Sequence, residues 1–160
     1  MTNDTEALLR RLQDEEDRLV LDRFTRNDAW RLGRSITEIA LEQGHPVVID
    51  IRRPDLILFR AALDGCTPDQ QVWAERKAAV VLRMEHSSAL VAARLAGVDT
   101  AALGWLDHRY ALTGGAIPIR VRGVGVVAAL AVSGLSSDDD HALAVRGLEA
   151  LARAGQHPQG

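Results

Sequence analysis

Apolar residues at helical spacing predict two helices in the first third of the chain. Residues 5–18 are mostly charged but carry a short stripe of leucines, a pattern that permits a helix. Residues 19–24 are predicted to form an extended entry segment. Thr25 or Asn27 can cap the next helix, whose apolar positions recur every three to four residues until Gly44 ends it.

Runs of β-branched and small apolar residues predict two pairs of neighbouring strands. Residues 47–51 and 56–63 flank a short turn, which indicates an antiparallel hairpin. Residues 116–121 and 125–132 form the second pair, and Pro118 is expected at a sheet edge or a bulge because it lacks an N–H donor. The segment 125–132 is almost entirely apolar and is therefore expected in the middle of the sheet, covered on both faces.

Three further segments are predicted to be helical. Thr67 and Pro68 provide a strong start signal, an N-cap followed by proline at the first helical position. His86 and its neighbours interrupt the pattern, which resumes over 89–95. The last helix begins after Ser136, with acidic residues in its first turn, where they favour the positive end of the helix dipole.

The order of these elements indicates an α+β fold, because the strands come in adjacent pairs rather than alternating singly with helices. We expect a mainly antiparallel sheet with helices on its faces. The predicted organisation is an N-terminal helical segment over 1–18, a single domain over 19–153 and a flexible tail over 154–160.

Composition and net charge argue against several classes of function. The 160 residues are 47% hydrophobic and 26% charged, as expected for one globular domain. The net charge of −3 argues against nucleic acid or an anionic membrane as the main partner. No apolar run is long enough to span a bilayer and no leader pattern opens the chain, so a cytoplasmic location is expected.

The basic residues are distributed unevenly. Of 19 basic residues, 18 are arginine and the only lysine is Lys77. Codon usage in a GC-rich genome explains an excess of arginine, but it does not explain the position of the single lysine.

Several segments, in this order and spacing, resemble the haem-degrading, HbpS-like family, which is also called GlcG-like. The segments are 75–78 with 83–88, 114–119, and 125–134 leading into 139–141. The details at 29–33 look most like the branch of uncharacterised proteins labelled haem-degrading. The resemblance spans roughly residues 19–152.

The resemblance implies a fold similar to profilin or roadblock domains, with a five-stranded antiparallel sheet between two layers of helices. It also implies a homodimer or larger homo-oligomer. Some members of the family bind haem, and many have no established activity. Haem or another small anionic ligand is therefore the expected cofactor or partner, without a prediction of its identity.

The resemblance and the local chemistry together give a set of candidate ligand contacts, and no metal site is predicted. The candidates are Arg76, Lys77, His86, Gly114, Gly115, Pro118, Asp140 and His141. The family motif places a lysine at position 77, where an ammonium group could bind a carboxylate or a haem propionate. The alternative is a solvated or salt-bridged lysine, paired with Glu75 or Asp69.

Each of the other candidates also has a structural alternative. Gly114 and Gly115 could form a backbone nest for an anion or a tight turn that needs a positive φ. His86 could be a haem ligand or a general base, or a helix-end histidine bonded to a nearby carbonyl. Asp140 and His141 could form a carboxylate–histidine cluster facing a pocket, or the acidic residues there could simply cap a helix.

Three functions remain open at this point. A small-ligand or haem-binding homo-oligomer has the most support. An oligomeric interaction scaffold without chemistry is the first alternative. The second is an enzyme for a small carboxylated substrate that uses Lys77 and His86, although no motif with a defined mechanism supports catalysis. The three tryptophans are expected in the core or at an interface.

Overall fold

The computed structural model describes residues 2–155, and most of the predicted elements are present within a few residues of their expected bounds. The elements of the first half are α1 (Asn3–Arg18), β1 (Val20–Leu21), α2 (Arg26–Gln43), β2 (Val48–Arg53) and β3 (Leu56–Ala62). Those of the second half are α3 (Pro68–Met84), α4 (Ser88–Arg94), a 3-10 helix (Thr100–Leu103), β4 (Ala116–Val121), β5 (Gly125–Ser133) and α5 (Ser137–Gly155).

The helix ends follow from their capping residues. Of the two candidate caps for α2, Thr25 is the one used: its hydroxyl accepts a hydrogen bond from Asp28 N at 3.1 Å. The Asp28 carboxylate accepts one from Thr25 N at 2.9 Å, which completes a capping box. Gly44 ends α2 in the left-handed conformation at φ 66°, which glycine adopts without steric cost. Pro68 is the first residue of α3, as predicted.

The five strands form one sheet in the order β1-β4-β5-β2-β3. The sheet is mixed, which corrects the expectation of a mainly antiparallel sheet. The entry segment Val20–Leu21 pairs in parallel with β4, while β4–β5, β5–β2 and β2–β3 are antiparallel. The strand β5 is central and buried, as its apolar sequence predicted.

Pro118 lies where a missing N–H donor is tolerated. It pairs with Ala129 of β5 on one side, whereas β1 pairs only with Arg120 and Val121 of β4. Beside Pro118, the other side of β4 therefore has no strand partner, and a register shift follows between Ile119 and Arg120. The prediction of an edge or bulge position is confirmed.

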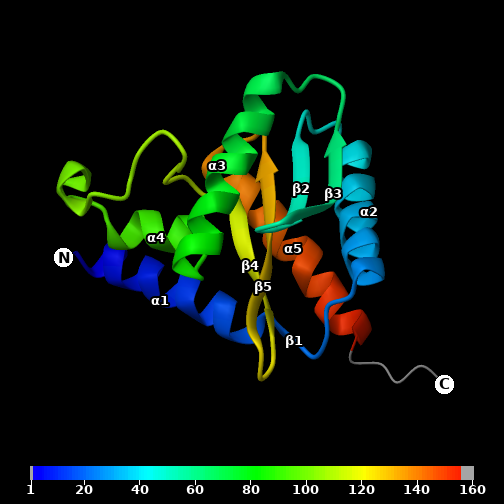
Figure 1. Cartoon of the computed structure of the whole chain (residues 1–160), viewed down its shortest axis with the longest axis horizontal. Coiled ribbons are helices and arrows are strands. Elements are labelled where there is room, and N and C mark those ends of the chain that lie inside the picture. Colours follow the sequence, from blue (N-terminus) through cyan, green and yellow to red (C-terminus); the bar gives the residue numbers. More distant parts are fainter. Residues whose placement is uncertain (1, 156–160) are drawn as a thin grey trace.

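Helices cover both faces of the sheet and give three layers (Figure 1). The helices α2 and α5 pack on one face and enclose the larger core, which includes Leu32, Ile36, Ile49, Leu130 and Leu148. The helix α3 packs on the opposite face over a smaller, alanine-rich core. The N-terminal helix α1 lies against α4 at the periphery.

The last turn of α5 contains residues 154 and 155, which were predicted as the start of the flexible tail. The rest of that predicted tail, 156–160, lies outside the described residues. None of the helices within 2–155 has an apolar stretch that could cross a bilayer.

Candidate functional site

Lys77 forms a buried ion pair with Asp140. Only 4% of Lys77 is exposed, and its Nζ donates hydrogen bonds to Asp140 Oδ2 at 2.9 Å and to the Val132 carbonyl at 3.1 Å. The interpretation of Lys77 as a solvated residue is therefore wrong. Its partner is neither Glu75 nor Asp69 but a residue 63 positions away, at the start of the last helix.

Gly115 makes room for this pair. Its φ of 135° is one that side chains rarely adopt, and a Cβ there would lie 2.7 Å from Lys77 Nζ and 2.5 Å from the Val132 carbonyl oxygen. A side chain at position 115 would therefore displace the lysine from Asp140. The lysine of α3 thus reaches α5 past the start of β4, at a point where the backbone carries no side chain.

The carboxylate of Asp140 also fixes the turn that leads from β5 into α5. It accepts hydrogen bonds from Leu135 N at 2.9 Å and, more weakly, from Gly134 N at 3.4 Å. Burial raises the pKa of Asp140 above its ordinary value, and the opposing effects of Lys77 and these two N–H groups do not cancel that increase. Asp140 therefore does more than favour the helix dipole, because it joins α3, the turn and α5.

A small cavity of about 270 Å³ borders this ion pair. Its polar wall includes Lys77, Asp140, Ser133 and Ser137, and Trp73 and Thr113 are also among its lining residues. Lys77 thus borders a space that could hold a small ligand, although its ammonium group is already bonded to two acceptors. We name this space the Lys77 cavity.

His141, the next residue along α5, faces a different environment. Its Nε2 lies 2.7 Å from Glu15 Oε1 of α1, and only 7% of the residue is exposed. His141, Glu15 and Gly114 line a larger cavity of about 590 Å³. We name it the α1–α5 cavity, since α1, α4, α5 and the segment 112–114 form its walls.

The second ring nitrogen of His141 has no partner. Among the described residues, its Nδ1 is the one buried side-chain nitrogen or oxygen that makes no hydrogen bond, and its accessible surface is below 1 Å². His141 also lines a second, very small cavity of about 10 Å³ together with Pro118 and Leu19. That volume is at the lower limit for one water molecule. A water molecule or a ligand atom there could supply the hydrogen-bond partner that Nδ1 lacks.

The contact with His141 affects the pKa of Glu15. Burial raises the pKa of Glu15, but the hydrogen bond with His141 and the charges of His141, Arg11 and Arg18 lower it by more in total. The resulting pKa lies below the ordinary value of 4.5, so Glu15 is ionised at neutral pH. In the neutral form of His141, an Nε2–H donated to the Glu15 carboxylate leaves Nδ1 with the lone pair, an arrangement common behind metal-bound histidines.

The wall of the α1–α5 cavity is apolar with a charged rim. Its apolar residues come from three helices and the 112–114 segment: Leu8, Leu12, Ala89, Ala92, Ala93, Leu112, Ala142 and Val145. Arg11, Arg18 and Arg146 lie on the rim, which also carries carboxylates. Arg18 pairs with Glu149 and Arg11 with Glu15, whereas Arg146 has no ion-pair partner among residues 2–155.

His86 is paired with the other glutamate of α1. Its Nδ1 lies 2.8 Å from Glu16 Oε2, and the same carboxylate accepts a hydrogen bond from Ser87 N at 2.6 Å. The expected bond from His86 to a nearby carbonyl is therefore replaced by a carboxylate 70 residues away. His86 and Lys77 have separate partners, so the described geometry does not join them into one catalytic arrangement.

The other candidates divide between these neighbourhoods. Gly114 is buried beside α5, and a Cβ there would lie 2.6 Å from the Ser137 carbonyl oxygen. Pro118 lines the small cavity beside His141. Arg76 lies half-buried on α3, where its backbone carbonyl accepts a hydrogen bond from Ala111 N. Glu15 and Glu16 could not be identified from the sequence, because both lie in a charged helix outside the segments that resemble the family.

The tryptophans do not lie in the core. Trp30 is 59% exposed and its ring lies against Phe59 with centroids 5.8 Å apart, while Trp73 is 38% exposed. Trp105 is half-buried and lies edge-on to Tyr110. The expectation of core positions is wrong, and the alternative of interface positions stays a prediction.

The residues of the α1–α5 cavity fit haem, the group that the resemblance implies. Haem needs apolar walls and an axial ligand, and cations near its propionates stabilise it further. This cavity supplies apolar walls and arginines, and His141, which lines it, has a buried Nδ1 without a hydrogen-bond partner. Within the described residues, no group of three or more His, Cys, Asp or Glu side chains could hold a metal ion, so a bare metal site is not formed there.

Fold and site together define a small α+β protein with a histidine-lined cavity between its N-terminal and C-terminal helices. The model of the family described as haem degrading protein HbpS-like matches residues 24–149. The chain therefore belongs to the HbpS-like family.

Individual relatives agree with this assignment. A UPF0303 protein from Streptomyces coelicolor is 44% identical over 151 residues, which cover 92% of this chain and 96% of that protein. The crystal structure of Ybr137w superposes with a TM-score of 0.86 at 34% identity, covering 93% of this chain and 90% of that one. A double mutant of HbpS from Streptomyces reticuli gives a TM-score of 0.68 at 25% identity, covering 80% and 86%.

Proposed function

We propose that this protein binds haem, or a small anionic ligand of that kind, in the α1–α5 cavity, with His141 as the axial residue. The observation that carries the proposal is the buried Nδ1 of His141, which has no hydrogen-bond partner while Glu15 holds the opposite ring nitrogen. The description of the family as haem-degrading supports this choice of ligand. Binding, rather than turnover, is the function that this geometry supports.

Access to Nδ1 of His141 requires a local rearrangement. The accessible surface of this nitrogen is below 1 Å², so a ligand that binds it has to displace side chains packed around the ring. Bound haem would supply an iron centre, while the chain would contribute a nitrogen ligand, apolar walls and arginine charges. Arg146 is the rim arginine best placed to meet a propionate, because the described residues offer it no ion-pair partner.

The other predicted contacts are not required for this proposal. Gly114 lines the same cavity as His141, and Lys77 and Asp140 border the smaller Lys77 cavity next to it. The roles of Arg76, His86, Gly115 and Pro118 in ligand binding stay predictions, as do the cytoplasmic location and the similarity to profilin or roadblock domains.

A hemin titration followed by absorbance tests the proposal. Wild-type protein is expected to show a saturable Soret shift at one hemin per chain, and His141→Ala is expected to weaken binding at least tenfold, since it removes the axial ligand. His86→Ala is the matched control, because His86 also pairs with a glutamate of α1 but lies on no wall of the α1–α5 cavity. If His141→Ala binds hemin as tightly as wild type does, His141 is not a ligand of the iron and the proposal fails.

An oligomeric scaffold without a ligand is the second candidate, and exposed apolar side chains favour it. Trp30 on α2 and the neighbours Leu56 and Ile57 on the edge strand β3 are all substantially exposed. An edge strand with apolar side chains is a common surface for pairing with another chain. Multi-angle light scattering is expected to show a defined homo-oligomer, and Ile57→Lys is expected to shift it toward monomer; a monomeric wild type would exclude the scaffold.

A further inference from the structure

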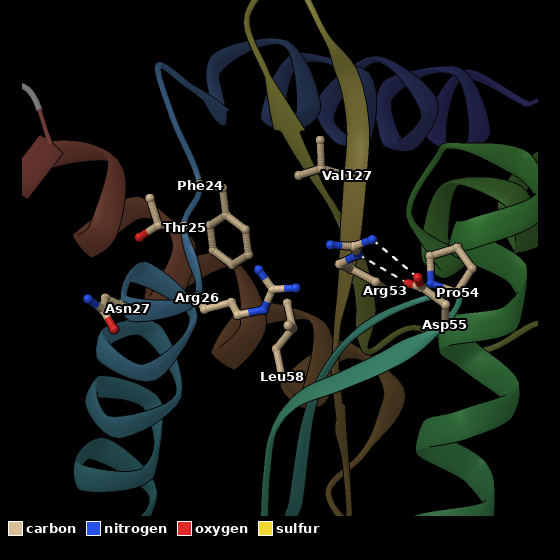
Figure 2. A pocket seen from close by; sticks show the side chains of 9 residues that line it. All are labelled: Phe24, Thr25, Arg26, Asn27, Arg53, Pro54, Asp55, Leu58 and Val127. Atoms are coloured by element: carbon tan, nitrogen blue, oxygen red, sulfur yellow. Dashed lines mark hydrogen bonds and ion pairs between the residues drawn. The ribbon is translucent and has the colours of Figure 1, made fainter.

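A separate cavity of about 940 Å³ lies at the opposite end of α2 from Gly44, and it shares no lining residue with the three cavities described above. Its walls are the start of α2, the β2–β3 turn, and single residues of β3 and β5. Figure 2 shows the nine side chains around it. Its volume is within the range of ordinary ligand sites.

One wall of this cavity is apolar and fixed by the core. Phe24, Leu58 and Val127 are half-buried and pack against the larger hydrophobic core, so their positions are held from behind. Figure 2 shows the three residues arranged around the central space. Such a surface favours an apolar ligand body, because covering it removes apolar area from water.

The charge on this cavity comes mainly from Arg26. Arg53, on the opposite rim, is neutralised by Asp55 through hydrogen bonds of 3.1 and 3.2 Å. Arg26 makes no hydrogen bond or ion pair through its side chain with any residue in the described part of the chain, and Figure 2 shows it extending between Phe24 and Leu58. An available guanidinium beside an apolar wall is suited to a carboxylate, sulfonate or phosphate, which it can bind through two parallel hydrogen bonds.

The same cavity has no side chain of the kinds that ligate haem iron. Its nine lining residues include no histidine, cysteine, methionine, tyrosine or lysine. We infer that it is a second ligand site, which takes a metal-free amphipathic anion: one acidic group held by Arg26 and an apolar body resting on Phe24, Leu58 and Val127. This site does not depend on the proposed haem site, since no residue is common to both.

The probe for this site is 1-anilinonaphthalene-8-sulfonate, a sulfonate on an aromatic body whose fluorescence rises in apolar surroundings. Wild-type protein is expected to bind it saturably at one site per chain. Arg26→Gln is expected to weaken binding about tenfold, the usual effect of losing one charged hydrogen-bonding partner. Arg34→Gln is the matched control, because Arg34 lies on the same helix, is paired with Glu38 and lines no part of this cavity.

Competition experiments distinguish the contribution of the anionic group to binding from that of the apolar body. Octanoate is expected to displace the probe from wild-type protein, whereas octanol, with the same chain length and no charge, is expected to displace it much less. Phe24→Ala supplies a second variant that removes wall area instead of charge, and circular dichroism confirms that each variant is folded. Equal probe affinity in wild type, Arg26→Gln and Arg34→Gln would overturn the inference, as would equal displacement by octanoate and octanol.

Discussion

The single lysine of this chain has a defined structural task. Lys77 links α3 to α5 through Asp140, and the pair is buried at a position where Gly115 leaves room for it. The sequence pointed to Lys77 by its rarity and by the family motif. It could not supply the partner, because the contact joins residues 63 positions apart and depends on how β5 turns into α5.

Removing the lysine is expected to destabilise the protein, because Asp140 would remain as a buried charge without its partner. Lys77→Met should lower the free energy of unfolding by about 3 kcal/mol. Urea unfolding at neutral pH measures this loss. The double variant Lys77→Met/Asp140→Asn should recover part of it, whereas strictly additive losses would show that the two residues are not coupled.

Gly115→Ala tests whether the Lys77–Asp140 pair requires a residue without a side chain at position 115. The added Cβ combines a strained φ with close contacts to the Val132 carbonyl and Lys77 Nζ, so the free energy of unfolding should fall by at least about 2 kcal/mol. Gly155→Ala is the control, since a Cβ there has no neighbour within 4 Å. Equal stability of the two variants in thermal or urea unfolding would contradict the packing described for Gly115.

At the level of elements, α1 is attached largely by polar contacts. Glu15 and Glu16 pair with His141 and His86, while Leu12 is its buried apolar residue. Sequence reasoning predicted the helix from its pattern, but it could not predict where the helix docks. Docking depends on pairs between residues more than 60 positions apart, and a charged surface pattern does not identify its partners.

The Glu15–His141 contact predicts a pH-dependent contribution to stability. Since the pKa of Glu15 is lowered on folding, its contribution is fully present above the ordinary pKa of 4.5 and is lost as the pH falls through the lowered value. Glu15→Gln should therefore lower the free energy of unfolding by about 1.5 kcal/mol at pH 7, and by progressively less below pH 4.5.

Denaturant unfolding at a series of pH values measures this difference. Glu6→Gln is the matched control in the same helix, because Glu6 is exposed and makes only a loose pair with Arg10 at 3.8 Å. A loss for Glu15→Gln that stays constant from pH 7 to pH 3 would contradict the assignment of a lowered pKa to Glu15.

At the scale of the whole molecule, the sequence was sufficient for the fold class and for most of the sheet. Adjacent strand pairs predicted the hairpins, and the apolar run of β5 predicted its central place. The parallel pairing of β1 was missed because Val20–Leu21 is only two residues long and its strand partner lies 100 residues further along the chain. The candidate contacts lie on and just after α3, at and before the start of β4, and on α5, and their roles in ligand binding stay predictions. The cavity at His141 also depends on α1, which the family resemblance does not cover.

The central claim is that His141 can act as an axial ligand inside the α1–α5 cavity. Its most direct test is chemical rescue: the absorbance spectrum of hemin bound to His141→Ala, recorded with and without free imidazole. We expect the variant to lose the Soret band of the wild-type complex and to regain it when imidazole occupies the vacated space. A His141→Ala spectrum identical to that of wild type before imidazole is added would contradict the claim.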